Sequence, residues 1–384
     1  MATSNLSVLV TEGVGFIASH VITLLLEKGY RVRATVTNSQ EESQLRTLCS
    51  ESKSILEVVE IGLFQDQGWD RAVKGCRYVI HDASNVPGSA SLNNDSPKLN
   101  VQCVKRILRA CADDGGVKRV VLTSSISAVH DHSSSESAFM DEEKKKIYNE
   151  SDWSHVDSPG LDIGAQTITL VERAAWDFIR ELPEKKKLEL SVINPGVVLG
   201  PLVCGFPSRS LEIVQKLFER TLQLIPKVHF CVADVRDVAQ AHLKVMTLPS
   251  AATHRHIVCT ESIWWRQIAH ILFTEFKPKG YHIPTTVAPF FVTWLGSFFD
   301  RSTSMIIPRI GRECSYDNKR MREILGVTPR DLSQTVLDTA YSLIEKGYIQ
   351  KSKRHRLETE LVSSKEDEIE NNQSKPHQPI CCVH

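Results

Sequence analysis

The sequence lacks an excess of charge, a long apolar run and a leader segment, and each absence excludes a class of function. Its 384 residues hold 46 Lys and Arg against 46 Asp and Glu, so the net charge gives no reason to expect a nucleic-acid partner. Aromatic residues make up only 7% and are not interleaved with basic residues. The amino terminus has no basic segment followed by a long apolar one, which predicts a cytoplasmic protein without a secretory signal.

The most apolar stretch, residues 287–299, is interrupted by Pro289 and is too short to span a bilayer. We interpret it as a helix in the core or at the rim of a substrate-binding region. The alternative is a surface patch that contacts a membrane or an apolar ligand. In either case the sequence predicts no membrane-spanning segment.

The ten cysteines are scattered without the spacing that metal ligands require. We therefore expect no metal, and we expect most of these cysteines to be buried thiols in a reducing compartment. The last four residues begin with Cys381, as a prenylation signal would, but a final histidine is unusual and Cys382 is a poor aliphatic match. We expect exposed thiols there, and contact with a membrane only if Cys381 or Cys382 is lipidated.

The sequence does contain a regular alternation of strand and helix patterns. Strands separated by helices form parallel sheets that are covered on both faces. The fold class is therefore predicted to be α/β, with a Rossmann-type doubly wound parallel sheet and a smaller C-terminal substrate region. The expected strands are 7–11, 30–36, 55–61, 78–81, 119–123 and 189–193, and the expected helices are 16–28, 69–74, 99–112 and 167–181.

Residues 1–350 are expected to form one domain with two parts. The part that binds NAD(P) is predicted mostly in residues 5–200 and 228–245, and the substrate region mostly in residues 201–227 and 246–350. Residues 351–384 are polar and charged and cannot bury enough apolar surface to fold, which predicts a disordered tail.

A turn that contains glycine joins the first strand to the first helix, in the segment VTEGVGFIASH of residues 10–20. In a dinucleotide-binding fold, the backbone N–H groups of this turn and the start of the helix hold the pyrophosphate. Gly13 and Gly15 would be a weak signal alone. Their place after a buried strand and before an apolar helix makes the signal stronger.

The loop resembles the Thr-Gly-x-x-Gly-x-x-Gly/Ala signature of the extended short-chain dehydrogenase/reductase family, with Thr11, Gly15 and Ala18 at matching positions. Glu12 takes the place of the first glycine. Its side chain intrudes on the tight turn, and its carboxylate opposes phosphate binding unless it turns into solvent.

Similarity to this family extends from residue 7 to about residue 347. It points to the branch of dihydroflavonol reductases, cinnamoyl-CoA reductases and related ketoreductases. The segments that carry it are 31–36, 72–84, 120–129, 172–179, 193–201 and 235–242.

The resemblance implies a role for each matching residue. Ser125 matches the serine that hydrogen-bonds the substrate carbonyl, Asn100 the asparagine near the proton relay, and Pro195 the proline beside the nicotinamide. A plainer alternative is that Ser125 caps a strand end and Pro195 terminates a strand. The positions expected to bind the cofactor are Gly13, Gly15, Phe16, Ile17, Arg33, Thr37, Leu63, Ala83, Ser84, Asn100, Thr123 and Pro195.

The tyrosine and lysine that perform this family's chemistry are missing. In the family, these two residues form a Tyr-x-x-x-Lys pair one helical turn apart. The tyrosine hydroxyl donates a proton to the carbonyl oxygen, and the positive charge of the lysine lowers the pKa of that hydroxyl. The segment ERAAWDF of residues 172–178 fixes the alignment and places Gly164 and Ile168 at these two positions. None of the seven tyrosines has a lysine four residues later, although Tyr316 is followed by Lys319.

Cofactor positions have changed as well. Thr37 stands where NADP-dependent relatives often have an arginine for the 2′-phosphate, and no acidic residue replaces it, so no switch to NAD is visible. Gly62 replaces an aspartate that usually meets the adenine. NADP or NAD is therefore a possible cofactor, with binding weakened or lost.

We interpret the chain as a reductase-fold protein that resembles NADPH-dependent carbonyl reductases and is catalytically impaired. Its expected partner is a small-molecule ligand or carbonyl substrate. The alternative is an active NAD(P)-dependent oxidoreductase that acts on CH–OH or carbonyl groups with an unconventional proton donor.

Overall fold

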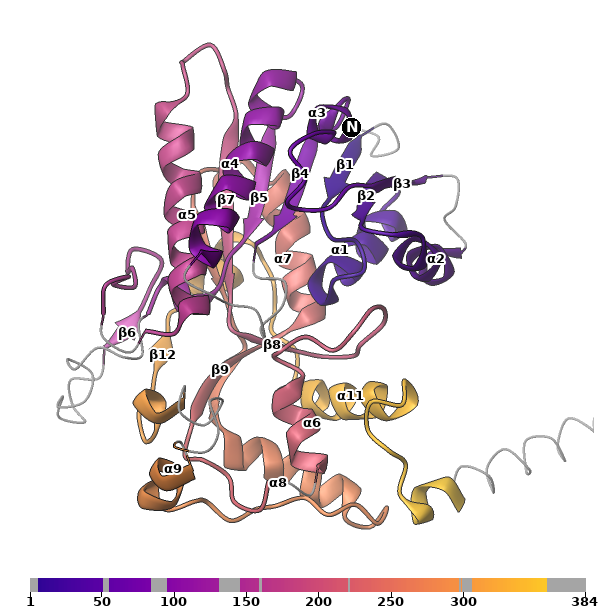
Figure 1. Ribbon diagram of the computed structural model, residues 1–384, viewed down its shortest axis with the longest axis vertical. Coiled ribbons are helices and arrows are strands. Elements are labelled where there is room, and N and C mark those ends of the chain that lie inside the picture. Colours follow the sequence, from indigo (N-terminus) through magenta and orange to yellow (C-terminus); the bar gives the residue numbers. More distant parts are fainter. Residues whose placement is uncertain are drawn as a thin grey trace, which may run out of the picture.

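The structure is a computed structural model that describes residues 6–50, 55–83, 95–130, 146–158, 161–219, 222–296, 298 and 306–357. Its central sheet has seven strands in the order β10-β7-β5-β4-β1-β2-β3, and all neighbouring pairs are parallel (Figure 1). This arrangement confirms the predicted fold class. The strands are β1 (Ser7–Val10), β2 (Arg31–Val36), β3 (Leu56–Glu60), β4 (Tyr78–Asp82), β5 (Arg119–Thr123), β7 (Glu189–Pro195) and β10 (Arg255–Val258).

Helices cover both faces of the sheet (Figure 1). Successive residues of a strand point to opposite faces, so Val8 belongs to one hydrophobic core and Leu9 to the other. The first core contains side chains of α1 (Phe16–Glu27), α2 (Ser39–Leu48) and α7 (Val235–Thr247). The second contains side chains of α3 (Trp69–Val73), α4 (Ser96–Asp114) and α5 (Ile163–Glu181).

Two helices differ from the sequence-based prediction in ways that matter for the site. Helix α2 was not predicted, because Leu45 is its only buried residue and its apolar pattern is therefore weak. Helix α5 begins one turn earlier than expected, since Asp162 caps its N-terminus by accepting hydrogen bonds from the backbone N–H groups of Gly164 and Ala165.

The sheet has a topological switch point at β1. From β1 the chain continues to β2 and β3 on one side, and it then returns to β4 and β5 on the other. Folds of this kind bind ligands in the crevice at the carboxyl ends of the strands that flank such a point. Glu12 follows β1 and Asp82 ends β4, so both lie at this crevice.

A smaller region lies beyond the carboxyl ends of the central strands (Figure 1). It contains a sheet of β8 (Val197–Leu199), β9 (His229–Asp234) and β11 (Glu261–Trp264), and a parallel pair of β6 (Ile147–Tyr148) and β12 (Ser315–Tyr316). Its helices are α6 (Glu212–Phe218), α8 (Trp265–Phe276), α9 (Phe290–Gly296) and α11 (Leu332–Glu345).

Helix α9 is the centre of the most apolar stretch of the sequence, and it lies at the surface. Phe290 and Phe291 are 58% and 67% exposed, whereas Thr293 is buried. The helix therefore has a position at the rim and not in the core. No helix among the described residues has the length and apolar character needed to cross a bilayer.

All eight described cysteines are free and buried, which confirms the prediction for them. Cys381 and Cys382 lie outside the described residues, as does the rest of the segment 358–384. The chain is described as far as residue 357. Near this end, Nδ1 of His355 lies 2.8 Å from the hydroxyl oxygen of Tyr281. The division into a cofactor-binding part and a substrate region remains a prediction.

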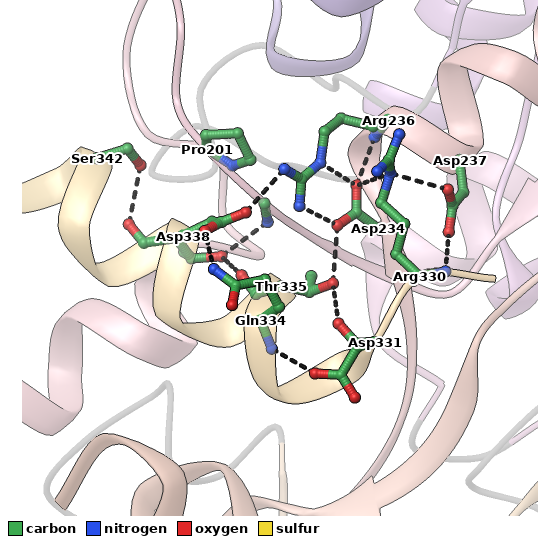
Figure 2. A network of polar contacts seen from close by, with 12 residues as sticks. Pro201, Asp234, Arg236, Asp237, Arg330, Asp331, Gln334, Thr335, Asp338 and Ser342 are labelled. Atoms are coloured by element: carbon green, nitrogen blue, oxygen red, sulfur yellow. Dashed lines mark hydrogen bonds and ion pairs between the residues drawn. The ribbon is translucent and has the colours of Figure 1, made fainter. Parts of the chain in front are cut away.

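A buried ion-pair network joins α11 to the start of α7 (Figure 2). The carboxylate of Asp234 is fully buried, and Arg236 donates to it from Nε at 3.0 Å and from Nη2 at 2.7 Å. The hydroxyl of Thr335 also donates to Asp234 at 2.7 Å. Arg236 reaches Asp338 of α11 at 2.7 Å, so the network fixes the two helices to each other.

Asp234→Asn is expected to lower the free energy of unfolding by about 3 kcal/mol at pH 7, because it removes the fully buried carboxylate of the network. Arg236 then keeps its ion pair with the partly exposed Asp338 but loses the buried one. Burial alone would raise the pKa of Asp234, but the hydrogen bonds from Arg236 and Thr335 outweigh it and lower this pKa. The stabilisation is therefore complete above the unfolded pKa of about 4 and is lost as the pH falls through the folded pKa.

Urea denaturation at pH 7 and pH 3 checks this prediction. Wild type should lose more stability than Asp234→Asn between the two pH values. Asp338→Asn is the control: Asp338 is 22% exposed, and its loss should cost less. Equal stability of wild type and Asp234→Asn at pH 7 would contradict the role given to the network.

Candidate dinucleotide site

A cleft of about 480 Å³ opens at the carboxyl ends of the central strands, on both sides of the switch point. Its walls come from the loop after β1, the end of β2, the segment after β5, the first turns of α5 and the segment 206–212. Of the sequence-predicted residues, those that line the cleft are Gly15, Phe16, Ile17, Thr37, Leu63, Ser125, Gly164, Ile168 and Pro195.

The backbone of the loop after β1 fits a pyrophosphate. Gly15 is the N-cap residue of α1, with no side-chain cap, so the N-terminal N–H groups of this helix are available to an anion. The turn requires its glycines: a Cβ on Gly13 would lie 2.9 Å from Cδ2 of Leu45, and one on Gly15 would lie 3.0 Å from the carbonyl oxygen of Glu12.

The side chain of Glu12 does not fit a pyrophosphate in the same way. Its φ of 52° is in the left-handed region, where a glycine would be free of strain. The carboxyl lines the cleft, and its Oε2 is buried without a hydrogen-bond partner. Burial raises the pKa of Glu12 well above its usual value, and the charges of Asp82 and Glu41 raise it further. Glu12 has therefore not turned into solvent.

The end of the cleft beside β2 contains an acidic residue that the sequence analysis missed. Thr37 lies there as expected, and the carboxylate of Glu41 accepts a hydrogen bond from its backbone N–H at 2.7 Å. Glu41 belongs to the first turn of α2, the helix that was not predicted. A signal was present, because Asn38 followed three residues later by Glu41 is the pattern of a helix N-terminus. Position 37 itself carries no acidic residue, but Glu41 brings a carboxylate to the same end of the cleft.

Ser125, Gly164 and Ile168 line the opposite end of the cleft. Gly164 and Ile168 share one face of α5, as the spacing requires. The Oγ of Ser125 accepts a hydrogen bond from the backbone N–H of Ser127 at 3.1 Å and thereby caps a short helical turn. Ser125 therefore caps this turn, and not the strand end of the plainer alternative, and it also lines the cleft.

Arg209 is the only Lys or Arg among the described residues that line the cleft. A Cβ on Gly164 would lie 3.7 Å from its Nη1, so its guanidinium is next to the position that the family's tyrosine would occupy. The side chain is exposed, and the sequence analysis did not single it out.

Buried polar contacts hold the strand end that carries Ser125. Ser124 donates to Glu172 at 2.6 Å, and Asn194 donates to the same carboxylate at 2.8 Å. Arg255 completes the cluster with an ion pair to Glu172 at 2.6 Å. These contacts connect β5, α5, β7 and β10 below the cleft, so the wall around Ser125 is rigid.

Several residues predicted to bind the cofactor do not line the cleft: Gly13, Arg33, Ala83, Asn100 and Thr123. Arg33 instead donates to the carbonyl oxygens of Ala72 and Lys74 at 2.8 Å and pairs with Glu57. Ser84 lies outside the described residues.

Asn100 and Thr123 make hydrogen bonds inside the fold, Asn100 within its own helix and Thr123 to a neighbouring one. Nδ2 of Asn100 donates to the carbonyl oxygen of Ser96 at 2.9 Å. The hydroxyl of Thr123 lies 2.7 Å from Nε2 of His242. The first bond lies within α4, and the second joins β5 to α7.

Neither Tyr316 nor the neighbouring Tyr148 lines the cleft, so neither is placed as a displaced proton donor. The ring of Tyr148 stacks on His130 with centroids 3.7 Å apart, and the hydroxyl of Tyr316 lies 3.1 Å from Nδ1 of His130. Burial raises the pKa of Tyr316 well above its usual value, which makes it a weaker acid. Within the described part of the chain, no cluster of His, Cys, Asp and Glu could hold a metal ion.

The fold and the cleft define a Rossmann-type oxidoreductase scaffold. The 3-beta hydroxysteroid dehydrogenase/isomerase family matches residues 9–159. Cinnamoyl-CoA reductase 1 of Petunia hybrida is 30% identical over 352 residues, which cover 89% of this chain and 93% of the relative. The chain belongs to the extended short-chain dehydrogenase/reductase family, in the branch that contains the cinnamoyl-CoA reductases.

Relatives with nicotinamide cofactors are among the matches. An NADPH-dependent methylglyoxal reductase of Saccharomyces cerevisiae is 28% identical over 359 residues, covering 88% of this chain and 98% of the relative. A crystal structure of the yeast methylglyoxal/isovaleraldehyde reductase with NADPH superimposes with a TM-score of 0.70 at 25% identity, covering 89% of this chain and 99% of that one.

Proposed function

We propose that this protein is a catalytically impaired reductase, which binds a nicotinamide dinucleotide and a small ligand but cannot supply the proton for carbonyl reduction. The observation that carries the proposal is the pair Gly164 and Ile168. Both line the cleft on the face of α5 where the family has its tyrosine and lysine. The side chains of these two residues, a hydrogen atom and a sec-butyl group, can neither donate a proton nor carry a charge.

The residues present can hold a dinucleotide at both ends of the cleft. The N–H groups at the start of α1 and the turn around Gly15 suit the pyrophosphate, and Pro195 and Ser125 line the nicotinamide end. A bound reduced nicotinamide would supply hydride. Ser125 can still hydrogen-bond a carbonyl oxygen, and Arg209 adds a positive charge nearby.

The charge of Arg209 can stabilise negative charge on an oxygen, but a guanidinium does not release a proton at neutral pH. A positioned general acid contributes about 10²–10⁴ to such a rate. The relatives support a carbonyl compound as the ligand class, since their names include methylglyoxal reductase and cinnamoyl-CoA reductase.

The test combines calorimetric titration of the purified protein with NADH and NADPH and a turnover assay with methylglyoxal. Binding of at least one dinucleotide is expected, together with reduction of methylglyoxal at a rate close to that measured without protein. Fast reduction that Ser125→Ala abolishes would establish the alternative, an active reductase with an unconventional proton donor. If neither dinucleotide binds at millimolar concentration to wild type or to the Glu12→Gly variant, the proposal is rejected.

A further inference from the structure

We infer that the cleft selects NAD(H) over NADP(H) and that Glu41 is the residue responsible. This inference rests on the proposed function, because it requires a dinucleotide in the cleft. It separates this chain from its yeast relative, which is an NADPH-dependent enzyme.

The first argument is the position of the carboxylate. Glu41 lines the cleft at the carboxyl end of β2, and the backbone N–H of Thr37 holds one of its oxygens at 2.7 Å. The contact fixes the side chain and leaves the second oxygen as an acceptor. In a dinucleotide-binding fold, an acidic group after the second strand accepts hydrogen bonds from the ribose hydroxyls next to the adenine.

The second argument is the absence of a counter-charge for a 2′-phosphate in the described part of the chain. The acidic residues that line the cleft are Glu12, Glu41, Asp82 and Glu212, and its one basic residue, Arg209, lies beside Gly164 at the other end. Placing a dianion beside Glu41 brings like charges together without compensation.

Two nearby arginines do not supply that charge. Arg33 on β2 pairs with Glu57 at 2.8 Å and donates to the carbonyl oxygens of Ala72 and Lys74 at the end of α3. Arg46 of α2 pairs with Glu42 at 2.8 Å, one residue along from Glu41. Neither lines the cleft, so each is engaged outside the place where the phosphate would lie.

Glu41 also has a structural role, because its carboxylate satisfies a backbone N–H in the turn before α2. The experiment must therefore separate charge from capping. Glu41→Gln keeps a side-chain oxygen that can accept from Thr37 and removes the charge. Glu41→Lys reverses the charge. Glu42→Gln and Glu42→Lys make the same changes at a neighbouring residue that does not line the cleft, and thermal unfolding of each variant reports on the helix.

The measurement is the dissociation constant of NADH and of NADPH by calorimetry, for wild type and the four variants. Wild type should bind NADH at least about tenfold more tightly than NADPH. Glu41→Gln should bring the two constants to within about threefold, and Glu41→Lys should favour NADPH. The Glu42 variants should keep the wild-type ratio.

The possible failures are distinguishable. Equal affinities in wild type, tighter binding of NADPH, or an unchanged ratio in Glu41→Lys would overturn the inference while the proposed function stands. The same titrations are repeated with the Glu12→Gly substitution added to each protein. This substitution removes another carboxyl from the cleft and should strengthen the binding of both dinucleotides. If neither NADH nor NADPH binds to wild type or to the Glu12→Gly variant, the proposed function is rejected, and this inference with it.

Discussion

Glu12→Gly is expected to raise the affinity for NADH at least about tenfold and to stabilise the folded protein by about 2 kcal/mol. The affinity rises because the carboxyl that lines the pyrophosphate end of the cleft is removed. The stability rises for two reasons. The residue at φ 52° becomes a glycine, which is free of strain there, and the buried Oε2 without a hydrogen-bond partner disappears.

The effect of Glu12 should depend on pH with a defined sign. Burial, together with Asp82 and Glu41, raises the pKa of this carboxyl in the folded protein. The folded state therefore binds its proton more tightly than the unfolded chain does, and Glu12 destabilises the fold progressively as the pH rises above the unfolded value of about 4.3. At pH 4 most of the charge-dependent part of the difference between wild type and variant should be gone.

Calorimetric titration with NADH and urea denaturation, each between pH 4 and 8, measure these effects. Glu12→Gln separates the charge from the backbone strain, since it keeps a side chain at the positive φ. Thr253→Gly is the matched control, because Thr253 is the other non-glycine residue with a positive φ, at 58°, in the described part of the chain, and it is exposed outside the cleft. It should gain stability without a change in NADH affinity. An unchanged affinity in Glu12→Gly would show that Glu12 does not oppose the cofactor.

The fold could be predicted because the buried parallel strands leave a strong pattern in the sequence. Short apolar runs such as β1 and β5 are hydrophobic on both faces, so their positions were predicted to within a few residues. The polar helix α2 shows the limit. Only Leu45 is buried on it, so apolar periodicity does not mark it, and local contacts such as the Asn38 cap and the ion pair between Glu42 and Arg46 stabilise it instead.

The candidate site was predictable where the residues follow a strand end in the chain. Glu12, Ser125 and Pro195 come directly after or at the end of central strands, so the topology alone places them at the crevice. Residues from unpredicted segments could not be placed in this way. Glu41 enters the cleft from α2 and Arg209 from the segment before α6, and no strand pattern points to either.

Arg33 illustrates a further limit, because a matching position does not fix the direction of a side chain. It lies on β2, next to the strand that leads into the nucleotide loop. Its guanidinium nevertheless pairs with Glu57 on β3, which is a neighbour in space that the sequence order does not reveal. Pairings of this kind decide whether a residue near a site belongs to it.

Gly164→Tyr combined with Ile168→Lys, in the Glu12→Gly background, is expected to raise NADH-dependent reduction of methylglyoxal at least about 100-fold over wild type. The introduced pair would stand on one face of α5, facing the cleft that Ser125 and Pro195 also line. The introduced lysine would lower the pKa of the phenol, and the guanidinium of Arg209 beside Gly164 would act in the same direction.

The cost to stability should be small. A Cβ at position 164 would come 2.9 Å from Oδ1 of Asp162, the group that caps α5, so this side chain must rotate. Weakening such a cap costs about 1 kcal/mol. The contact with Arg209, at 3.7 Å, is an ordinary one. The variant should therefore remain folded, which thermal unfolding checks.

The matched control is Gly164→Phe with Ile168→Lys, which adds the same ring and the same charge without the hydroxyl. Initial rates with saturating NADH compare the two variants, and calorimetry confirms that both bind it. If only the tyrosine variant gains activity, the missing proton donor is the cause of the impairment, since the rest of the cleft must already present hydride and carbonyl in a productive arrangement. If both bind NADH and neither reduces the substrate, the cleft has lost the carbonyl position beside Ser125 as well, and its ligand is not a substrate for reduction.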